Sequence, residues 1–201
     1  MGKLLLRSYA CHTEEAESYF RTLGKTNRKK EEAMKSHALT TGVVTAFDAP
    51  FSLCSHVEWA VNGVLGAPHT FRWKKISAAP DRFATSLRWE APVGTGARIA
   101  SALLGWTNLR FEIIEDPMST ALGTCVMRTP SLGTFTGQVD DFGSIVLTEH
   151  QIDTILSDST ALLSDVTERM HRALGRHWDR ELEPLRVAAS RENVMVLQRV
   201  G

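Results

Sequence analysis

Three residues that can bind a metal ion or perform catalysis lie close together at Cys54, His56 and Glu58. If a helix includes them, its turn of about 100° per residue places Cys54 and Glu58 on one face and His56 about 200° away from Cys54. One metal ion could not reach all three side chains, so we expect no metal site here. Ser55 and Glu58 also match a capping box, which gives Glu58 a structural role at the start of the helix.

Cys54 carries the remaining catalytic hypothesis, because it follows a strand-like segment and lies near the amino end of the predicted helix. The partial positive charge of a helix amino end lowers the pKa of a thiol, and the thiolate is the reactive form. His56 would then be the candidate general base. The alternative is a buried thiol in the core, which is a common role for cysteine and the one we expect.

A second candidate site is the turn Gly94-Thr95-Gly96, with Arg98 in the first turn of a predicted helix. Unpaired backbone N–H groups at such a helix start can hold a phosphate or a carboxylate, so these four residues are candidate anion ligands. A dinucleotide fingerprint would need a third small residue where Ile99 stands, and we expect no cofactor. The alternative is a flexible turn that lets the helix pack closely on a sheet.

The elements that must position these residues form two strand-helix-strand units. The first occupies 42–47, 55–65 and 70–73, and the second occupies 82–89, 95–104 and 109–115. Short strands are expected at 125–127, 134–136 and 144–147, helices from 148, over 161–174 and over 178–184, and a closing strand at 194–200. The doubled unit predicts an α+β fold with a ferredoxin-like split βαβ sandwich core and additional C-terminal strands and helices.

Alternation along the predicted strands separates an aromatic sheet face from a basic one. The basic face carries Arg72, Lys74, Arg88 and Arg110, whereas the aromatic face carries Phe71, Trp73, Phe83 and Trp89. RNA-recognition domains place aromatic residues among the basic ones, so nucleic-acid binding is not expected. We expect acidic residues of the C-terminal half to cover the basic face, drawn from Asp140, Asp141, Asp179, Glu181 and Glu183. Trp59, Trp73, Trp89 and Trp106 are expected to be structural.

Composition limits the function classes further. The 201 residues contain 23 Lys and Arg against 23 Asp and Glu, so no net charge draws the chain to nucleic acid or to a membrane. The three cysteines, Cys11, Cys54 and Cys125, are far apart, which argues against a disulfide framework and favours the reducing cytoplasm. No apolar run approaches the roughly 18 residues of a membrane-spanning helix.

Residues 1–40 differ in charge from the rest, because they hold eight Lys and Arg against five Glu. We expect a basic extension that is disordered or loosely helical, since it offers little apolar surface to bury. Residues 41–201 are expected to form a single α+β domain.

Five separated sequence blocks resemble the actinobacterial domain-of-unknown-function family 3145. They are CSHVEWAVNGVLG (54–66), GTGA (94–97) with SALLGW (101–106), LRFE (109–112), TPSLG (129–133) and WDRELEP (178–184). The resemblance extends from about Thr41 to the C-terminus. The family has no assigned activity, and the resemblance implies an accessory role linked to fatty-acid metabolism. We therefore expect a non-catalytic cytoplasmic accessory or binding protein with a protein partner. The alternative is a small enzyme or redox-sensing protein that uses Cys54 and His56.

Overall fold

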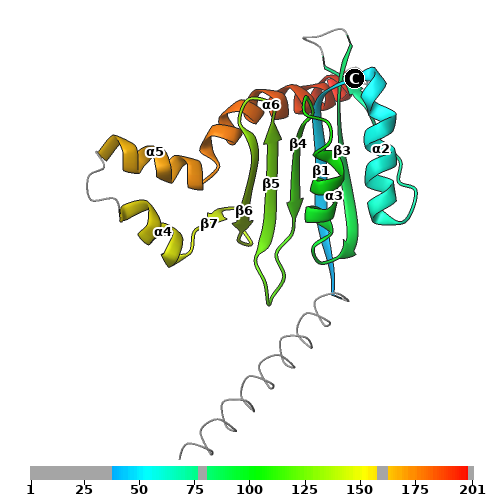
Figure 1. Ribbon diagram of the computed structural model, residues 1–201. Helices are drawn as coiled ribbons and strands as arrows, with labels where there is room; N and C mark the ends of the chain where they lie inside the picture. The colour runs from blue at the N-terminus through cyan, green and yellow to red at the C-terminus, as the bar shows by residue number, and fades with distance from the viewer. Residues whose placement is uncertain (1–37, 77–80, 158–162, 199–201) are drawn as a thin grey trace, which may run out of the picture. The chain divides into compact units, whose positions relative to one another are not determined.

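Seven strands form one antiparallel sheet in the computed structural model, which describes residues 38–76, 81–157 and 163–198 (Figure 1). The strands are β1 (Leu39–Pro50), β2 (Lys74–Lys75), β3 (Arg82–Pro92), β4 (Arg110–Glu115), β5 (Gly123–Thr129), β6 (Gly133–Val139) and β7 (Ile145–Val146). The helices are α2 (Phe51–Leu65), α3 (Thr95–Leu103), α4 (Glu149–Leu156), α5 (Leu163–Ala173) and α6 (Arg176–Gln198). The strand order is β2-β3-β1-β4-β5-β6-β7, so the predicted α+β class is confirmed and β1 lies between β3 and β4. The predicted basic extension lies outside the described residues, apart from its last three positions.

The first core lies between α2, α3 and one face of the sheet. Buried Val44 on β1, Trp89 on β3 and Phe111 on β4 share this face with Val57 of α2 and Leu103 of α3. Alternate residues of a strand point to the same side, so the predicted aromatic face is the face that these helices cover. The helix α2 ends at Gly66, whose φ of 72° is the left-handed conformation that glycine adopts readily.

The second core lies on the opposite face, where α6 crosses the sheet (Figure 1). Trp178 and Leu182 of α6 are buried against Met127 of β5 and Phe135 of β6. The indole Nε1 of Trp178 also donates a hydrogen bond of 3.0 Å to the carbonyl oxygen of Gly133. This packing fixes the first half of α6 on the sheet and directs its second half over β1 and β3.

A β-bulge in β1 places an acidic residue, Asp48, against Arg110 of the predicted basic face. The register with β3 shifts between Ala46 and Ala49, and Asp48 has a positive φ of 50°. Its carboxylate accepts a hydrogen bond of 3.0 Å from Arg110, which also pairs with Glu181 of α6 at 3.4 Å. The expectation that C-terminal acidic residues answer the arginines is therefore correct for Glu181.

Three predicted elements differ from the structure. Residues 194–198 continue α6 and do not form a closing strand, because the helix that starts at Arg176 is not interrupted. Pro184 lies inside α6, where burial of the preceding turns compensates for the backbone hydrogen bond that proline cannot make. Only Lys74 and Lys75 pair with β3, so the alternation at 70–73 reflects packing of Phe71 and Trp73 on the first core.

Candidate functional site

Cys54 lies inside α2 and is 6% exposed, in agreement with the core role. The helix begins at Phe51 after Pro50, so the thiol is a full turn past the first residue and its Sγ lies 3.6 Å from the carbonyl oxygen of Pro50. Burial, and then the negative charge of Glu58, raise the pKa of Cys54. A raised pKa disfavours the thiolate that the catalytic alternative requires.

His56 does not share the environment of Cys54, because His56 is exposed. The predicted capping box of Ser55 and Glu58 is wrong, since α2 starts four residues earlier with no side-chain cap. Glu58 instead accepts a hydrogen bond of 2.6 Å from Nε1 of Trp73. Trp59 is 77% exposed, so its expected role in the core is also wrong. Within the described segments, no group of three or more His, Cys, Asp or Glu could hold a metal ion.

The helix start at Gly94 already holds an anion, which is a carboxylate of this chain. The backbone N–H of Gly94 donates to Oε1 of Glu115 at 2.7 Å, and the backbone N–H of Gly96 donates to Oε2 at 2.6 Å. Thr95 donates its hydroxyl to the carbonyl oxygen of Pro92. Glu115 is 5% exposed, so the N–H groups that were expected to face a ligand are occupied by β4. Arg98 is exposed and points to the carbonyl oxygen of Val64, at 3.4 Å.

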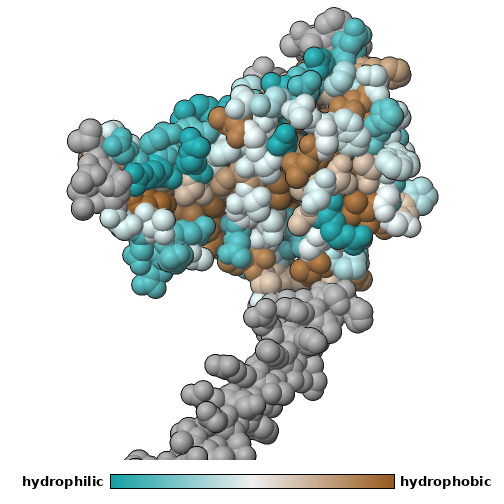
Figure 2. All heavy atoms as spheres, in the orientation of Figure 1, coloured by the Kyte–Doolittle hydropathy of each residue, from teal (hydrophilic) through white to brown (hydrophobic). Residues whose placement is uncertain are grey.

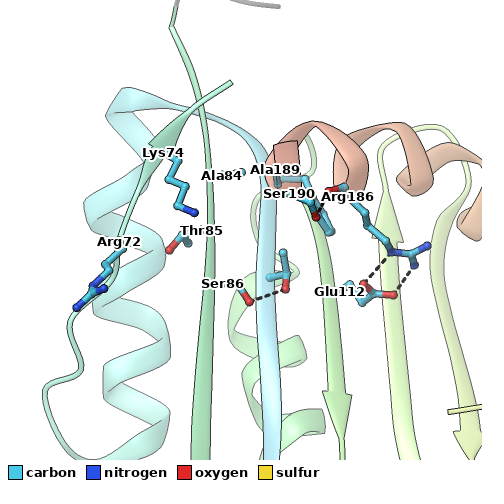
Figure 3. Close-up of a pocket in the computed structure, with 11 residues that line it drawn as sticks. Arg72, Lys74, Ala84, Thr85, Ser86, Glu112, Arg186, Ala189 and Ser190 are labelled. Carbon is cyan, nitrogen blue, oxygen red and sulfur yellow. Dashed lines mark hydrogen bonds and ion pairs between the residues drawn. The ribbon is translucent and has the colours of Figure 1, made fainter. Parts of the chain in front are cut away.

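A cavity of about 360 Å³ lies between the second half of α6 and the polar face of the sheet (Figure 3). Its lining comes from β1, β2 and the segment before it, β3, β4 and α6. The lining residues are Thr45, Phe47, Arg72, Lys74, Ala84, Thr85, Ser86, Glu112, Arg186, Ala189 and Ser190. The residues that line the cavity are therefore spread along the sequence from Thr45 to Ser190.

Small side chains explain why this space stays open. Ala84 and Ser86 of β3 face Ala189 and Ser190 of α6 across the cavity, and none of them is long enough to fill it (Figure 3). Packing of Leu182 and the ion pairs of Arg186 hold α6 on the sheet in the two turns that precede Ala189 and Ser190.

The guanidinium of Arg186 forms hydrogen bonds with carboxylates of the protein itself. Its Nε and Nη2 donate hydrogen bonds to the two carboxylate oxygens of Glu112, at 3.1 and 2.5 Å. Nη2 also donates to Asp179 at 3.1 Å, and Nη1 donates to Glu183 at 3.2 Å. Burial alone would lower the pKa of Arg186, but these carboxylates outweigh it and raise the pKa above its ordinary value. Arg186 therefore offsets part of the negative charge of Glu112, because its single positive charge is shared with Asp179 and Glu183.

Arg72 and the hydroxyls of Thr45 and Ser86 are the polar groups of the cavity that can bind a ligand. Arg72 is exposed and has no hydrogen-bond or ion-pair partner among the residues that the structure describes. Lys74 extends toward Thr85, whose buried hydroxyl has no hydrogen-bond partner (Figure 3). The hydroxyls of Thr45 and Ser86 lie 3.1 Å apart. Together these groups offer positive charge at one side of the cavity and hydroxyl donors along its floor.

The sequence signal for this site is incomplete. Alternation along 70–75 marked Arg72 and Lys74 as neighbours on one face, but no local pattern distinguished Arg186 or Ser190 from other polar residues of a helix. The long-range crossing of α6 brings these residues together.

Comparison with known proteins identifies a family. The family model described as "Protein of unknown function (DUF3145)" matches residues 43–199 of the chain. No curated protein and no solved structure matches the sequence.

Proposed function

We propose that this chain, which belongs to the DUF3145 family of proteins of unknown function, is a non-catalytic binding protein for a small molecule with an anionic group. The observation that carries the proposal is the cavity under α6, which is lined by Arg72, a residue without a hydrogen-bond or ion-pair partner among the described residues. A volume of about 360 Å³ is at the lower end of the range for ligand pockets, so a small metabolite fits better than a dinucleotide.

Binding is better supported than chemistry, because the lining residues include no cysteine and no histidine. Hydroxyls such as those of Ser86 and Ser190 need an adjacent base before they become nucleophiles. The carboxylate of Glu112 could act as a base, but its two oxygens already accept hydrogen bonds from Arg186. The alternative hypothesis, an enzyme or redox sensor that uses Cys54 and His56, has less support. The thiol of Cys54 is buried with a raised pKa, and the imidazole of His56 is exposed.

Thermal unfolding in the presence of anions tests the proposal. Inorganic phosphate, pyrophosphate and citrate are the probes, each compared with chloride at equal ionic strength. A ligand at about 100 times its Kd stabilises the folded state by about 2.7 kcal/mol. For a chain of this size, that corresponds to a rise in Tm of about 5–11 °C, at about 2–4 °C per kcal/mol.

Two variants locate the effect. Arg72→Gln should abolish most of the rise in Tm, because Arg72 borders the cavity. Lys75→Gln is the matched control, since Lys75 neighbours the cavity residue Lys74 in β2, is exposed and does not line the cavity. If Lys75→Gln reduced the anion effect as much as Arg72→Gln did, the effect would be general surface screening and the proposal would fail.

We also propose a ferredoxin-like core, an actinobacterial cytoplasmic location and an accessory role linked to fatty-acid metabolism. The order β2-β3-β1-β4, with α2 and α3 packed on one face, supports the core. The free thiols of Cys54 and Cys125 support a reducing compartment. In the part of the chain that the structure covers, no helix is long and apolar enough to cross a membrane. The metabolic link follows from the family resemblance, and co-purification with acyl-carrier protein from the native host tests it.

A further inference from the structure

The helix α2 exposes two aromatic side chains to solvent. Phe51 is 73% exposed and Trp59 is 77% exposed, although both belong to a helix whose other side is buried in the first core. Trp59 also has no hydrogen-bond or ring partner among the residues that the structure describes. Single exposed apolar residues are common, but tryptophan is enriched among the residues that carry the energy of protein interfaces. The outer face of α2 is therefore a candidate interaction surface.

This outer face carries no formal charge at pH 7. None of the exposed residues of α2 is Lys, Arg, Asp or Glu. They are Phe51, Ser52, Ser55, His56, Trp59 and Gly63. The solvent-exposed side of a surface helix normally carries charged residues, whereas the centres of protein interfaces are depleted of them. Figure 2 shows deep teal over much of α5, whereas the surface over α2 is mostly pale or brown. The face therefore suits an uncharged protein surface and has no charge that attracts an anionic membrane or nucleic acid.

Large and small residues alternate along the outer face. Every fourth residue of a helix lies on one ridge. The ridge on this face consists of Phe51, Ser55, Trp59 and Gly63. The space above Gly63 is open, because a Cβ at this position would contact no other part of the chain within 4 Å. The ring of Phe51 contacts the ring of Phe83, with 5.7 Å between their centroids, which holds it at the start of the ridge. The ridge therefore has two aromatic projections, and each is followed one turn later by a gap.

A second copy of α2 in antiparallel orientation complements this ridge. When a two-fold axis passes beside position 57, Phe51 faces Gly63 of the second copy and Trp59 faces Ser55 of the second copy. A shift of one copy by one helical turn, in either direction, opposes aromatic residues with aromatic residues and small residues with small ones. Alternation of large and small residues across facing positions is the pattern of a well-packed helix pair. Because no exposed residue of this face is charged, the two-fold arrangement brings no like charges together on it.

We propose that the outer face of α2 is a dimerisation surface, on which a second copy of this chain packs its own α2 in antiparallel orientation. Trp59 of each copy fills the gap at Ser55 of the other, and Phe51 fills the gap at Gly63. A contact through one helix of each copy falls below the total of about 1,200 Å² that stable interfaces bury, so we expect a reversible dimer. The self-complementary order of these four residues favours a second copy over an unrelated protein.

Sedimentation velocity of the full chain, from low to high micromolar concentration, measures this dimer. Trp59→Ser should raise the Kd of self-association at least about tenfold, because loss of an interface tryptophan is among the costliest truncations. Phe142→Ser is the matched control, since Phe142 is 92% exposed but lies between β6 and β7. It should leave the Kd unchanged. Both positions are exposed, so both variants should fold, and circular dichroism and Tm check this.

An exchange of the two central residues tests the register of the helix pair. Ser55→Trp alone places an indole against Trp59 of the second copy, so it should weaken the dimer although it adds apolar surface. Ser55→Trp combined with Trp59→Ser in one chain again opposes a large side chain with a small one across the two-fold axis. Since residues in contact are energetically coupled, this double variant should recover a Kd within about threefold of the wild-type value.

Several outcomes would overturn the proposal. A monomer at every concentration would exclude the dimer, and an unchanged Kd for Trp59→Ser would remove α2 from the interface. Stronger self-association of Ser55→Trp than of the wild-type chain would show that apolar surface alone drives association, without the proposed register. Binding to vesicles of phosphatidylcholine that Trp59→Ser abolishes would assign the face to a membrane surface. No residue of α2 lines the anion cavity, so this proposal and the proposed function fail separately.

Discussion

Replacement of Glu115 by alanine tests whether an internal carboxylate is required at the start of α3. Glu115 is 5% exposed and accepts hydrogen bonds from the backbone N–H groups of Gly94 and Gly96, at 2.7 and 2.6 Å. Glu115→Ala leaves both donors without their partner at a point where the helix dipole favours a negative charge. The variant should therefore fold with a clear loss of stability.

The magnitude follows from the two hydrogen bonds. A hydrogen bond to a charged group contributes about 1.5–3 kcal/mol, so the pair contributes about 3–6 kcal/mol. Gly94 is exposed and water can replace its partner, whereas Gly96 is buried, so we expect the lower part of that range. A loss of about 3–4 kcal/mol lowers Tm by about 6–16 °C in a chain of this size. Glu115→Gln keeps one accepting oxygen and should lose about half as much free energy.

Rescue by a small anion makes the assay specific. Formate at about ten times its Kd should return about 1.4 kcal/mol to Glu115→Ala by occupying the vacated position. Chloride at equal ionic strength is the salt control, and the wild-type chain should show no such gain. Glu90→Ala is the matched variant, because Glu90 is an exposed carboxylate on β3. A drop in Tm no larger than that of Glu90→Ala would refute the reasoning. A loss of stability that formate does not restore would show that the N–H groups of Gly94 and Gly96 do not bind an anion.

Three further predictions concern the two cores and the α6 ion pairs. Trp89→Ala should cost about 3–5 kcal/mol in urea unfolding, because Trp89 is 2% exposed, and Trp59→Ala should cost far less because Trp59 is 77% exposed. Arg186→Met should cost about 1.5–3 kcal/mol by removing the charge-assisted hydrogen bonds to Glu112, whose side chain is 13% exposed, and Glu112→Gln in the same chain should recover part of it. Burial, followed by the charges of Glu112 and Asp179, raises the pKa of Cys125 from 9.0 to about 12. The protonated thiol therefore favours folding fully below about pH 9, and this contribution is lost as the pH rises toward about 12, so Cys125→Val should flatten the fall in stability over that window.

Local sequence patterns predicted the first half of the domain well. The helices expected over 55–65 and 95–104 depend on short-range apolar spacing, and the structure confirms both as α2 and α3, although α2 starts four residues earlier. The aromatic face was predictable because side chains alternate along a strand whatever the strand pairs with. The strand at 194–200 was wrong because a short alternating run is also compatible with a helix, and only continuity with α6 decides between them.

The sequence itself determined the α+β class, the two strand-helix-strand units and the buried role of Cys54. The tertiary structure alone decided the sites. The sequence shows N–H groups at Gly94 and Gly96, but only the pairing of β4 beside α3 places the carboxylate of Glu115 on them. Arg186 lies 74 residues from Glu112 in the chain, and only the crossing of α6 brings them together over the cavity. Contacts between distant segments depend on the packing of the whole core, which no local pattern of residues encodes.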